Sequence, residues 1–235
     1  MDLQALLLTF RLALVTTMIL MAIALPLAWW IVFRRGRARA LIQALVALPL
    51  VLPPTVLGFY LLVALGPSTA IGRGITHLLG HPLAFSFSGL VVGSVIYSLP
   101  FAVQPLVAGF GSVDTALLDT AATLGASPLR AFRSIALPLA RTSLLTSAVL
   151  TFTHTVGEFG VVLMLGGNIP GATRTLSIAL YDQVQDFDYA RANQTALLLV
   201  AISFAALLLI YTRSGAAGNG SMLGSRASTK ADELG

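Results

Sequence analysis

The sequence predicts an all-α, polytopic membrane protein with about five transmembrane helices and one long water-facing helical segment. Of its 235 residues, 57% are hydrophobic and only 10% are charged, a balance far from that of soluble domains. Several apolar stretches reach the roughly 20 residues that a helix needs to cross a hydrocarbon layer about 30 Å thick. A mean hydropathy of +0.89 agrees with this class. The absence of cysteine excludes disulfides, thiolate nucleophiles and cysteine-ligated metals.

The basic residues predict the orientation of the chain, because they cluster where apolar stretches end. Most fall on the predicted cytoplasmic side: Arg34, Arg35, Arg37, Arg39, Arg130, Arg133, Arg141, Arg213, Arg226 and Lys230. The others fall on the opposite side: Arg11, Arg73, Arg174 and Arg191. This bias predicts an external N-terminus and a cytoplasmic C-terminus. The same bias indicates that the net charge of +5 reflects the topology of the chain in the membrane and not nucleic-acid binding.

The first predicted span covers residues 10–33. Arg11 lies near its outer end, where a long side chain can reach the lipid headgroups. Trp29 and Trp30 lie near its inner end, where amphipathic rings favour the membrane interface. The basic cluster that starts at Arg34 ends this span on the cytoplasmic side.

The second predicted span covers residues 41–65 and contains Pro49, Pro53 and Pro54. Each proline removes a backbone donor and crowds the preceding turn, so this span must kink or unwind. The carbonyl groups that it frees must face protein or water, because lipid cannot satisfy them. Two interpretations remain open for the bend: a place on a translocation path, or a packing kink alone.

Residues 66–87 are rich in Gly, Pro, Ser and His and predict an external loop. His77 and His81 stand four residues apart, a spacing that can hold a metal, but no third ligand is nearby. We therefore expect solvated loop histidines and no metal site. A third span, over residues 88–110, returns the chain to the cytoplasmic side.

A water-facing, amphipathic helix pair is predicted over residues 114–141. Gly125 suits the end of the first helix, while Ser127 and Pro128 suit the N-cap and first position of the second. Apolar residues recur at helical spacing in both helices: Leu117, Leu118, Ala121, Ala122 and Leu124, then Leu129, Phe132 and Ile135. Two helices joined by a glycine turn predict a rigid knob on the membrane surface.

A fourth span, over residues 142–165, contains His154 and Glu158, which we expect on one helical face. A charged side chain within a span usually faces a bundle interior or a water-filled cavity. One interpretation is that the two residues line a polar path. The alternative is a purely structural role, in which they form a buried ion pair or the Glu158 carboxylate is capped by nearby backbone.

The remainder of the chain completes a transmembrane domain of residues 1–213. Residues 166–192 are too polar to cross a membrane and predict an external re-entrant or surface loop, with a short helix over residues 175–185. The last span covers residues 192–211. Residues 214–235 are small and polar, without an apolar period, and predict a disordered cytoplasmic tail.

One spacing within the helix pair resembles the EAA loop, E-A-A-x3-G-x9-I-x-L-P, of the permease subunits of ABC importers. The matching residues are Asp119, Thr120, Ala121, Gly125, Ile135, Leu137 and Pro138. The departures are an Asp in place of Glu, which keeps the acid on a shorter side chain, and a Thr in place of the first Ala. The resemblance implies the type I ABC-importer permease fold, in which this loop is a coupling helix that docks in a groove of the cytoplasmic ATPase.

Three longer phrases resemble the molybdate permeases among these subunits: residues 48–62, 123–140 and 157–175. The last two are shared with sulfate permeases, so a sulfate/thiosulfate or tungstate importer is the alternative. The resemblance implies a bacterial inner-membrane protein that works as a homodimer with two ATP-binding cassette subunits and a periplasmic molybdate-binding protein. The ATPase-coupling residues are then Asp119, Thr120, Ala121, Gly125, Ser127, Phe132, Ile135, Leu137 and Pro138, and the path residues are Pro53, Pro54, Gly157, Glu158, Phe159 and Gly160.

No catalytic residue, cofactor or metal is expected. The sequence lacks the G-x4-G-K-[ST] loop that cradles nucleotide phosphates, so the energy for transport must come from another subunit. A rival function is an intramembrane enzyme that uses His154 and Glu158. The pair lacks an HExxH arrangement, however, and has no serine partner in a supporting context.

Overall fold

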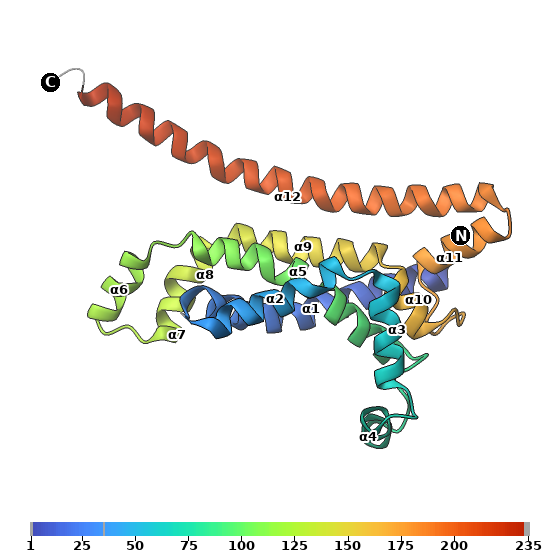
Figure 1. The fold of residues 1–235 in the computed structure, drawn as a ribbon. Coiled ribbons are helices and arrows are strands. Elements are labelled where there is room, and N and C mark those ends of the chain that lie inside the picture. Colours follow the sequence, from blue (N-terminus) through green and yellow to red (C-terminus); the bar gives the residue numbers. More distant parts are fainter. Residues whose placement is uncertain (1, 35, 233–235) are drawn as a thin grey trace.

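A computed structural model describes residues 2–34 and 36–232, and Figure 1 shows the arrangement of the helices. The described residues contain no strand. The elements are α1 (Leu3–Phe33), α2 (Arg37–Val51), α3 (Pro54–Leu65), α4 (Ala70–Leu79), α5 (Phe87–Gly111), α6 (Thr115–Thr123), α7 (Pro128–Ala131), a π-helical turn (Phe132–Ala136), α8 (Leu137–Leu139), α9 (Arg141–Gly157), α10 (Gly160–Gly166), α11 (Leu176–Gln185) and α12 (Tyr189–Asp232). The predicted all-α class is confirmed.

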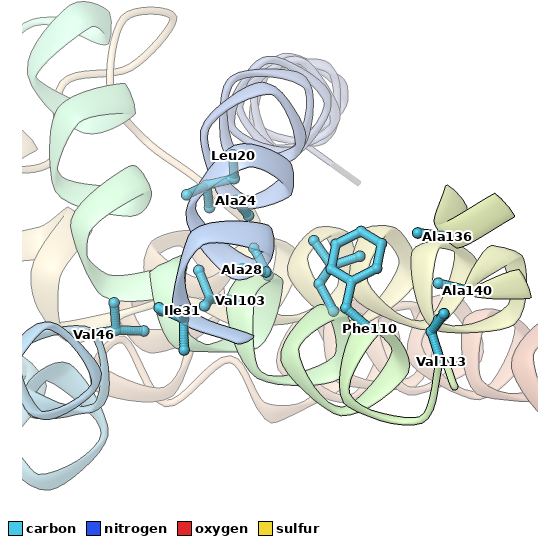
Figure 2. Packing of buried hydrophobic residues seen from close by; sticks show 12 residues of the cluster. Leu20, Ala24, Ala28, Ile31, Val46, Val103, Phe110, Val113, Ala136 and Ala140 are labelled. Atoms are coloured by element: carbon cyan, nitrogen blue, oxygen red, sulfur yellow. The ribbon is translucent and has the colours of Figure 1, made fainter. Parts of the chain in front are cut away.

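Three helices, α1, α5 and α9, pack against one another as the centre of the bundle. One buried stripe of α1 carries Leu20, Ala24 and Ala28, and it meets Val103 and Phe110 of α5 (Figure 2). Small side chains at four-residue spacing let two helix backbones approach closely. Such close packing lets helices associate in a bilayer, where the hydrophobic effect does not drive one helix against another. This packing fixes the relative positions of the elements that end beside it.

The described helices provide three long spans and two bent ones. Helices α1, α5 and residues 189–212 of α12 are long and apolar enough to cross a membrane by themselves. Helices α2 and α3 are bent by 111° from each other, and the segments Pro128–Leu139 and Arg141–Gly157 by 75°. If each bent pair is one span, the total is five, although the second pair includes residues 128–139 of the predicted water-facing helix pair.

The proline-rich second span is broken rather than gently kinked. Leu52 and Pro53 are extended, and α3 starts afresh with Pro54 at its first turn. Helix α3 then packs against α10 through glycines: a Cβ on Gly58 would lie 2.8 Å from the Met164 Cβ, and one on Gly160 only 2.6 Å from the Pro54 Cβ. Close approach at both glycines fixes the direction of α3 after the break.

The fourth span differs from its prediction as one continuous helix over residues 142–165. Helix α9 ends at Gly157, Glu158 is extended with φ −65° and ψ 132°, and α10 begins at Gly160. Glycine is a poor helix former, so Gly157 and Gly160 make this stretch easy to unwind. The Ser177 hydroxyl of α11 donates to the Glu158 carbonyl, which satisfies an acceptor that the broken helix leaves free.

The predicted external loop of residues 66–87 contains a helix, α4. Its ends carry recognisable signals that the glycine-rich composition hides: the Thr69 hydroxyl accepts from the Gly72 N–H at 2.9 Å, and Gly80 ends the helix in the left-handed region at φ +75°. Within the next loop, Thr175 caps α11, and the predicted short helix is confirmed as Leu176–Gln185.

Helix α12 runs beside α9 and α11 and continues to Asp232, so the segment predicted as a disordered tail is helical up to that residue. This segment contains no proline, and nothing in it therefore blocks continued backbone hydrogen bonding. Residues 233–235 of the predicted tail lie outside the described residues. The orientation of the termini across the membrane stays a prediction.

Candidate functional site

A cavity of about 470 Å³ opens where α3, α5, α9 and α10 meet. Its lining is Pro54, Thr55, Tyr97, Thr153, His154, Gly157, Glu158, Phe159 and Gly160. Five of the six predicted path residues are therefore brought together, although they come from two segments about a hundred positions apart. The sixth, Pro53, lies exposed at the break before α3 and outside the lining.

Glu158 is the only acidic residue in this lining, and its side chain is almost fully buried, with 4% of its surface exposed. Neither carboxylate oxygen has a hydrogen-bond partner among the residues that the structure describes. Its backbone is well held, because its N–H contacts the Thr155 carbonyl and its carbonyl accepts from Ser177. A fixed backbone thus holds this buried carboxyl group beside the cavity.

His154 lines the same cavity but is engaged by α5. Its Nδ1 lies 2.9 Å from the Ser98 hydroxyl, and its ring stacks on Phe101 with centroids 3.9 Å apart. The expected common helical face with Glu158 is wrong, because α9 ends between the two residues. Within the described chain, the two side chains form no ion pair, so the structural alternative of a buried pair is not realised there.

A ladder of hydroxyl groups joins α5 to α9 beside the cavity and is not among the sequence predictions. Ser98 lies 3.1 Å from the Thr155 hydroxyl, and the Ser147 hydroxyl donates to the Ala102 carbonyl at 2.6 Å. A signal for it exists, since Ser94 and Ser98 on α5, and Ser147, Thr151 and Thr155 on α9, recur every four residues. Such a stripe marks a polar helix interface inside a membrane protein.

The helix pair forms as its sequence predicts, at the far end of the bundle from α11 (Figure 1). Gly125 has a left-handed backbone with φ +81°, and the Ser127 hydroxyl accepts from the Arg130 N–H at 3.3 Å. No residue of α6 is buried, and Leu117 and Leu124 are exposed. Helix α6 therefore leaves most of its surface exposed, apart from Leu118, which packs against the core.

The predicted coupling residues fall into two groups. One group is exposed on the knob: Asp119, Thr120, Gly125, Ser127 and Pro138. The other is half-buried: Ala121, Phe132, Ile135 and Leu137. Phe132 packs against Trp29 at a centroid distance of 5.1 Å, and therefore anchors the knob to α1 rather than presenting it outward.

The two loop histidines lie on the surface of the molecule. His77 and His81 are both exposed, and the described residues hold no group of three or more His, Cys, Asp or Glu side chains that would bind a metal. Arg174 instead organises this end of the molecule, with a guanidinium nitrogen 2.8 Å from Asp182 and another 3.9 Å from Asp2.

The chain matches the family described as binding-protein-dependent transport system inner membrane component over residues 19–217. It is 50% identical over 212 residues to the molybdenum transport system permease protein ModB of Azotobacter vinelandii, covering 90% of this chain and 93% of that protein. It is 33% identical over 207 residues to ModB of Escherichia coli strain K12, covering 88% and 90%. A putative molybdenum permease of Bacillus subtilis strain 168 is 34% identical over 203 residues, covering 86% and 89%.

Two solved transporters share the fold. An inward-facing structure of the MetNI methionine ABC transporter superposes with a TM-score of 0.71 at 17% identity, covering 92% of this chain and 95% of that one. A bacterial ABC transporter that imports alginate gives a TM-score of 0.69 at 18% identity, covering 92% and 78%. At these identities the likeness concerns the fold alone, and it confirms the predicted ABC-importer permease architecture.

Proposed function

Because this chain belongs to the family of binding-protein-dependent transport system inner membrane components, we propose that it is the permease subunit of an ATP-driven molybdate importer. The observation that carries the proposal is the 50% identity to the Azotobacter vinelandii molybdenum permease over 90% of the chain. The chain is a multi-pass inner-membrane transporter subunit and not itself an enzyme. ATP hydrolysis belongs to a separate ATPase subunit.

The cavity around Glu158 is the translocation path in this proposal. Hydroxyl groups, glycines and aromatic rings make up most of its lining, and no Arg or Lys is among them. A path that conducts must bind its ion weakly enough to release it, and a dianion held by several arginines would not leave. The mixed lining supports passage of an oxyanion whose selection occurs elsewhere, on the binding protein.

An intramembrane hydrolase is disfavoured by the same geometry. Ser98 and His154 lie within hydrogen-bond distance, as a nucleophile and its base would. The Ser98 side chain is completely buried between α5 and α9, however, and its hydroxyl also contacts Thr155. A nucleophile that no substrate reaches does no chemistry, so this pair holds two helices together.

The partners follow from the surfaces that the chain leaves open. The exposed knob formed by α6 and α7 supports docking of a cytoplasmic ATPase, through Asp119, Gly125 and Ser127. The cavity is open on one side, which supports a second copy of the chain as its other wall, and hence a homodimer with two ATPase subunits. The periplasmic molybdate-binding protein then meets the opposite end, consistent with the bias of basic residues toward the cytoplasmic side.

Reconstitution tests the proposal directly. The permease, its ATPase and its binding protein, placed in liposomes with ATP inside the compartment that the ATPase faces, are expected to accumulate molybdate only when all three are present. Tungstate should compete, and sulfate should compete poorly. Uptake of sulfate in preference to molybdate would show that sulfate is the substrate instead. Uptake without ATP would contradict the assignment as an ATP-driven importer.

A further inference from the structure

A second cavity, of about 550 Å³, opens where α1 and α5 begin, at the opposite end from the α6–α7 knob. Its lining is Leu8, Arg11, His81, Phe85, Ser86, Phe87, Ser88, Gly171 and Ala172. It contains one cation, one imidazole and two hydroxyl groups, and no carboxylate. This composition is the reverse of the path cavity, which holds a carboxylate and no cation.

Arg11 differs from the other basic residues at this end. Arg174 contacts Asp182 at 2.8 Å, Arg191 contacts Asp188 at 3.3 Å, and Arg73 donates to the Ser68 carbonyl at 2.7 Å. Arg11 has no ion pair or hydrogen bond with any described residue. Its five N–H donors are therefore available to a ligand.

The neighbouring side chains hold Arg11 in place without consuming those donors. Its guanidinium carbon lies 4.4 Å from the centroid of the Phe87 ring, a cation–π contact that leaves the edge of the guanidinium free. Phe87 is fixed in turn, because the Ser86 hydroxyl caps α5 by accepting from Gly89 and donates to the Leu83 carbonyl. The cation is thus positioned before any ligand arrives.

Two more polar side chains line the same hollow, and both use a hydrogen within the chain. The Ser88 hydroxyl donates to that of Ser86 at 2.9 Å, because the Ser86 hydrogen is already donated to Leu83. The His81 Nδ1–H donates to the Pro82 carbonyl at 3.0 Å. Arg11 is therefore the group in this hollow with free N–H donors, and a guanidinium matches two oxygens of one tetrahedral ion at once.

We propose that Arg11 forms an entry site that gathers tetrahedral oxyanions at the external mouth of the permease. The inference rests on the proposed function for the identity of the oxyanion, and it adds a site on the permease before the path. A cation in a partly enclosed hollow raises the local concentration of anions and their rate of arrival. The same chemistry would also bind the phosphate of a lipid headgroup, so the source of the oxyanion must be tested.

The test uses the absence of native cysteine. Ala172 is exposed and lines the hollow, so Ala172→Cys places one thiol beside Arg11 in the complete complex, held in lipid nanodiscs. The rate of labelling of the permease by an anionic methanethiosulfonate is compared with the rate for a cationic one. Asn193→Cys, exposed on α12 outside the hollow, is the matched control.

For the thiol of the Ala172→Cys variant, we compare the ratio of the anionic labelling rate to the cationic labelling rate. This ratio should be at least about fivefold higher with Arg11 than with Arg11→Gln. Arg11→Lys should retain most of the preference, and high salt should remove it because mobile ions screen the charge. Tungstate or sulfate should protect the thiol saturably. The Asn193→Cys control should show none of these changes.

Each other outcome counts against the entry site. Protection that appears only with phosphatidylglycerol in the nanodisc, and not with soluble oxyanion in zwitterionic lipid, would assign Arg11 to a lipid headgroup. Unchanged rates in Arg11→Gln would show that the hollow does not gather anions. These labelling rates do not depend on transport, so uptake by the native complex, measured in parallel, separates failure of the site from failure of the proposed function.

Discussion

Phe132 lies edge-on to Trp29, with their ring centroids 5.1 Å apart, so the exposed knob is packed directly on the C-terminal end of α1. Phe110 of α5 completes the contact, with its ring 5.8 Å from each of the other two. Edge-to-face aromatic pairs add to the energy of burial and prefer defined angles. We therefore expect any movement of the knob to reach α1 and α5 together, since these two helices pack at the centre of the bundle.

Phe132→Ala should loosen this three-ring contact. Loss of a half-buried ring is expected to lower the free energy of unfolding by about 2 kcal/mol. Stimulation of ATPase activity by the loaded binding protein should fall further than basal activity does. Leu139→Ala, which removes a side chain that is 58% exposed, is the control and should change neither. Full stimulation in Phe132→Ala would show that the rings do not couple the two ends.

Gly125 provides the second test, because its φ of +81° is disfavoured for residues with a Cβ. No neighbouring atom of the chain would touch a Cβ there, so within this subunit the substitution acts on the backbone conformation. Gly125→Val should strain the turn by about 1–2 kcal/mol and reduce ATP-driven uptake at normal membrane abundance. Gly125→Asp should do the same mainly through a new charge in the ATPase groove.

The control for this turn is Gly125→Asn, since asparagine tolerates the left-handed region. It should retain most of the uptake. Equal uptake by the Val, Asp and Asn variants would mean that the geometry of the turn does not matter for coupling.

Alanine substitutions at Gly157 and Gly160, which both line the path cavity, distinguish a packing effect from an effect on the cavity lining. Gly160→Ala puts a Cβ 2.6 Å from that of Pro54, so α3 must move away from α10, whereas Gly157→Ala meets no atom within 4 Å. Gly160→Ala is expected to lower thermal stability and uptake together, by roughly 1–3 kcal/mol in stability. Gly157→Ala should leave stability within about 0.5 kcal/mol. Comparable losses in both variants would contradict the observed contact between α3 and α10.

Glu158→Leu tests whether the carboxyl group without a partner serves transport. If the carboxyl group belongs to the path, uptake should fall more than membrane abundance, because a leucine of similar size keeps the packing and removes the polar group. Glu158→Gln keeps a hydrogen-bonding group and should retain more uptake than Leu. Loss of folded protein in both variants, measured by size-exclusion chromatography, would instead assign the residue a structural role.

Local signals allow much of this fold to be predicted from the sequence. The third span, predicted over residues 88–110, is Phe87–Gly111, and the caps around Gly125 and Ser127 follow their sequence signals. These features depend on a few adjacent residues and on apolar length. The grouping of the path residues follows instead from the resemblance to known permeases.

The remaining features depend on contacts that no local pattern reveals. The break at Glu158 is held by Ser177, 19 residues away, and His154 is engaged by Ser98, 56 residues away. Apolar composition over residues 142–165 favours one helix, and only the packing of Gly160 against Pro54 shows why it is interrupted. The outward group of coupling residues is likewise separable from the inward group only once Phe132 is placed on Trp29.

The Thr9 hydroxyl accepts a hydrogen bond from the Leu176 N–H at 2.8 Å, and Arg174 bridges toward Asp2 at the start of the same helix. The first span leaves the ribosome long before either partner has been synthesised. In the membrane, the Thr9 hydroxyl and Asp2 therefore lack these partners until some 167 further residues have been synthesised. The order in which spans enter the bilayer and the order in which they lock together are different, so truncated chains that end before α11 should insert normally and yet remain sensitive to quality-control proteases.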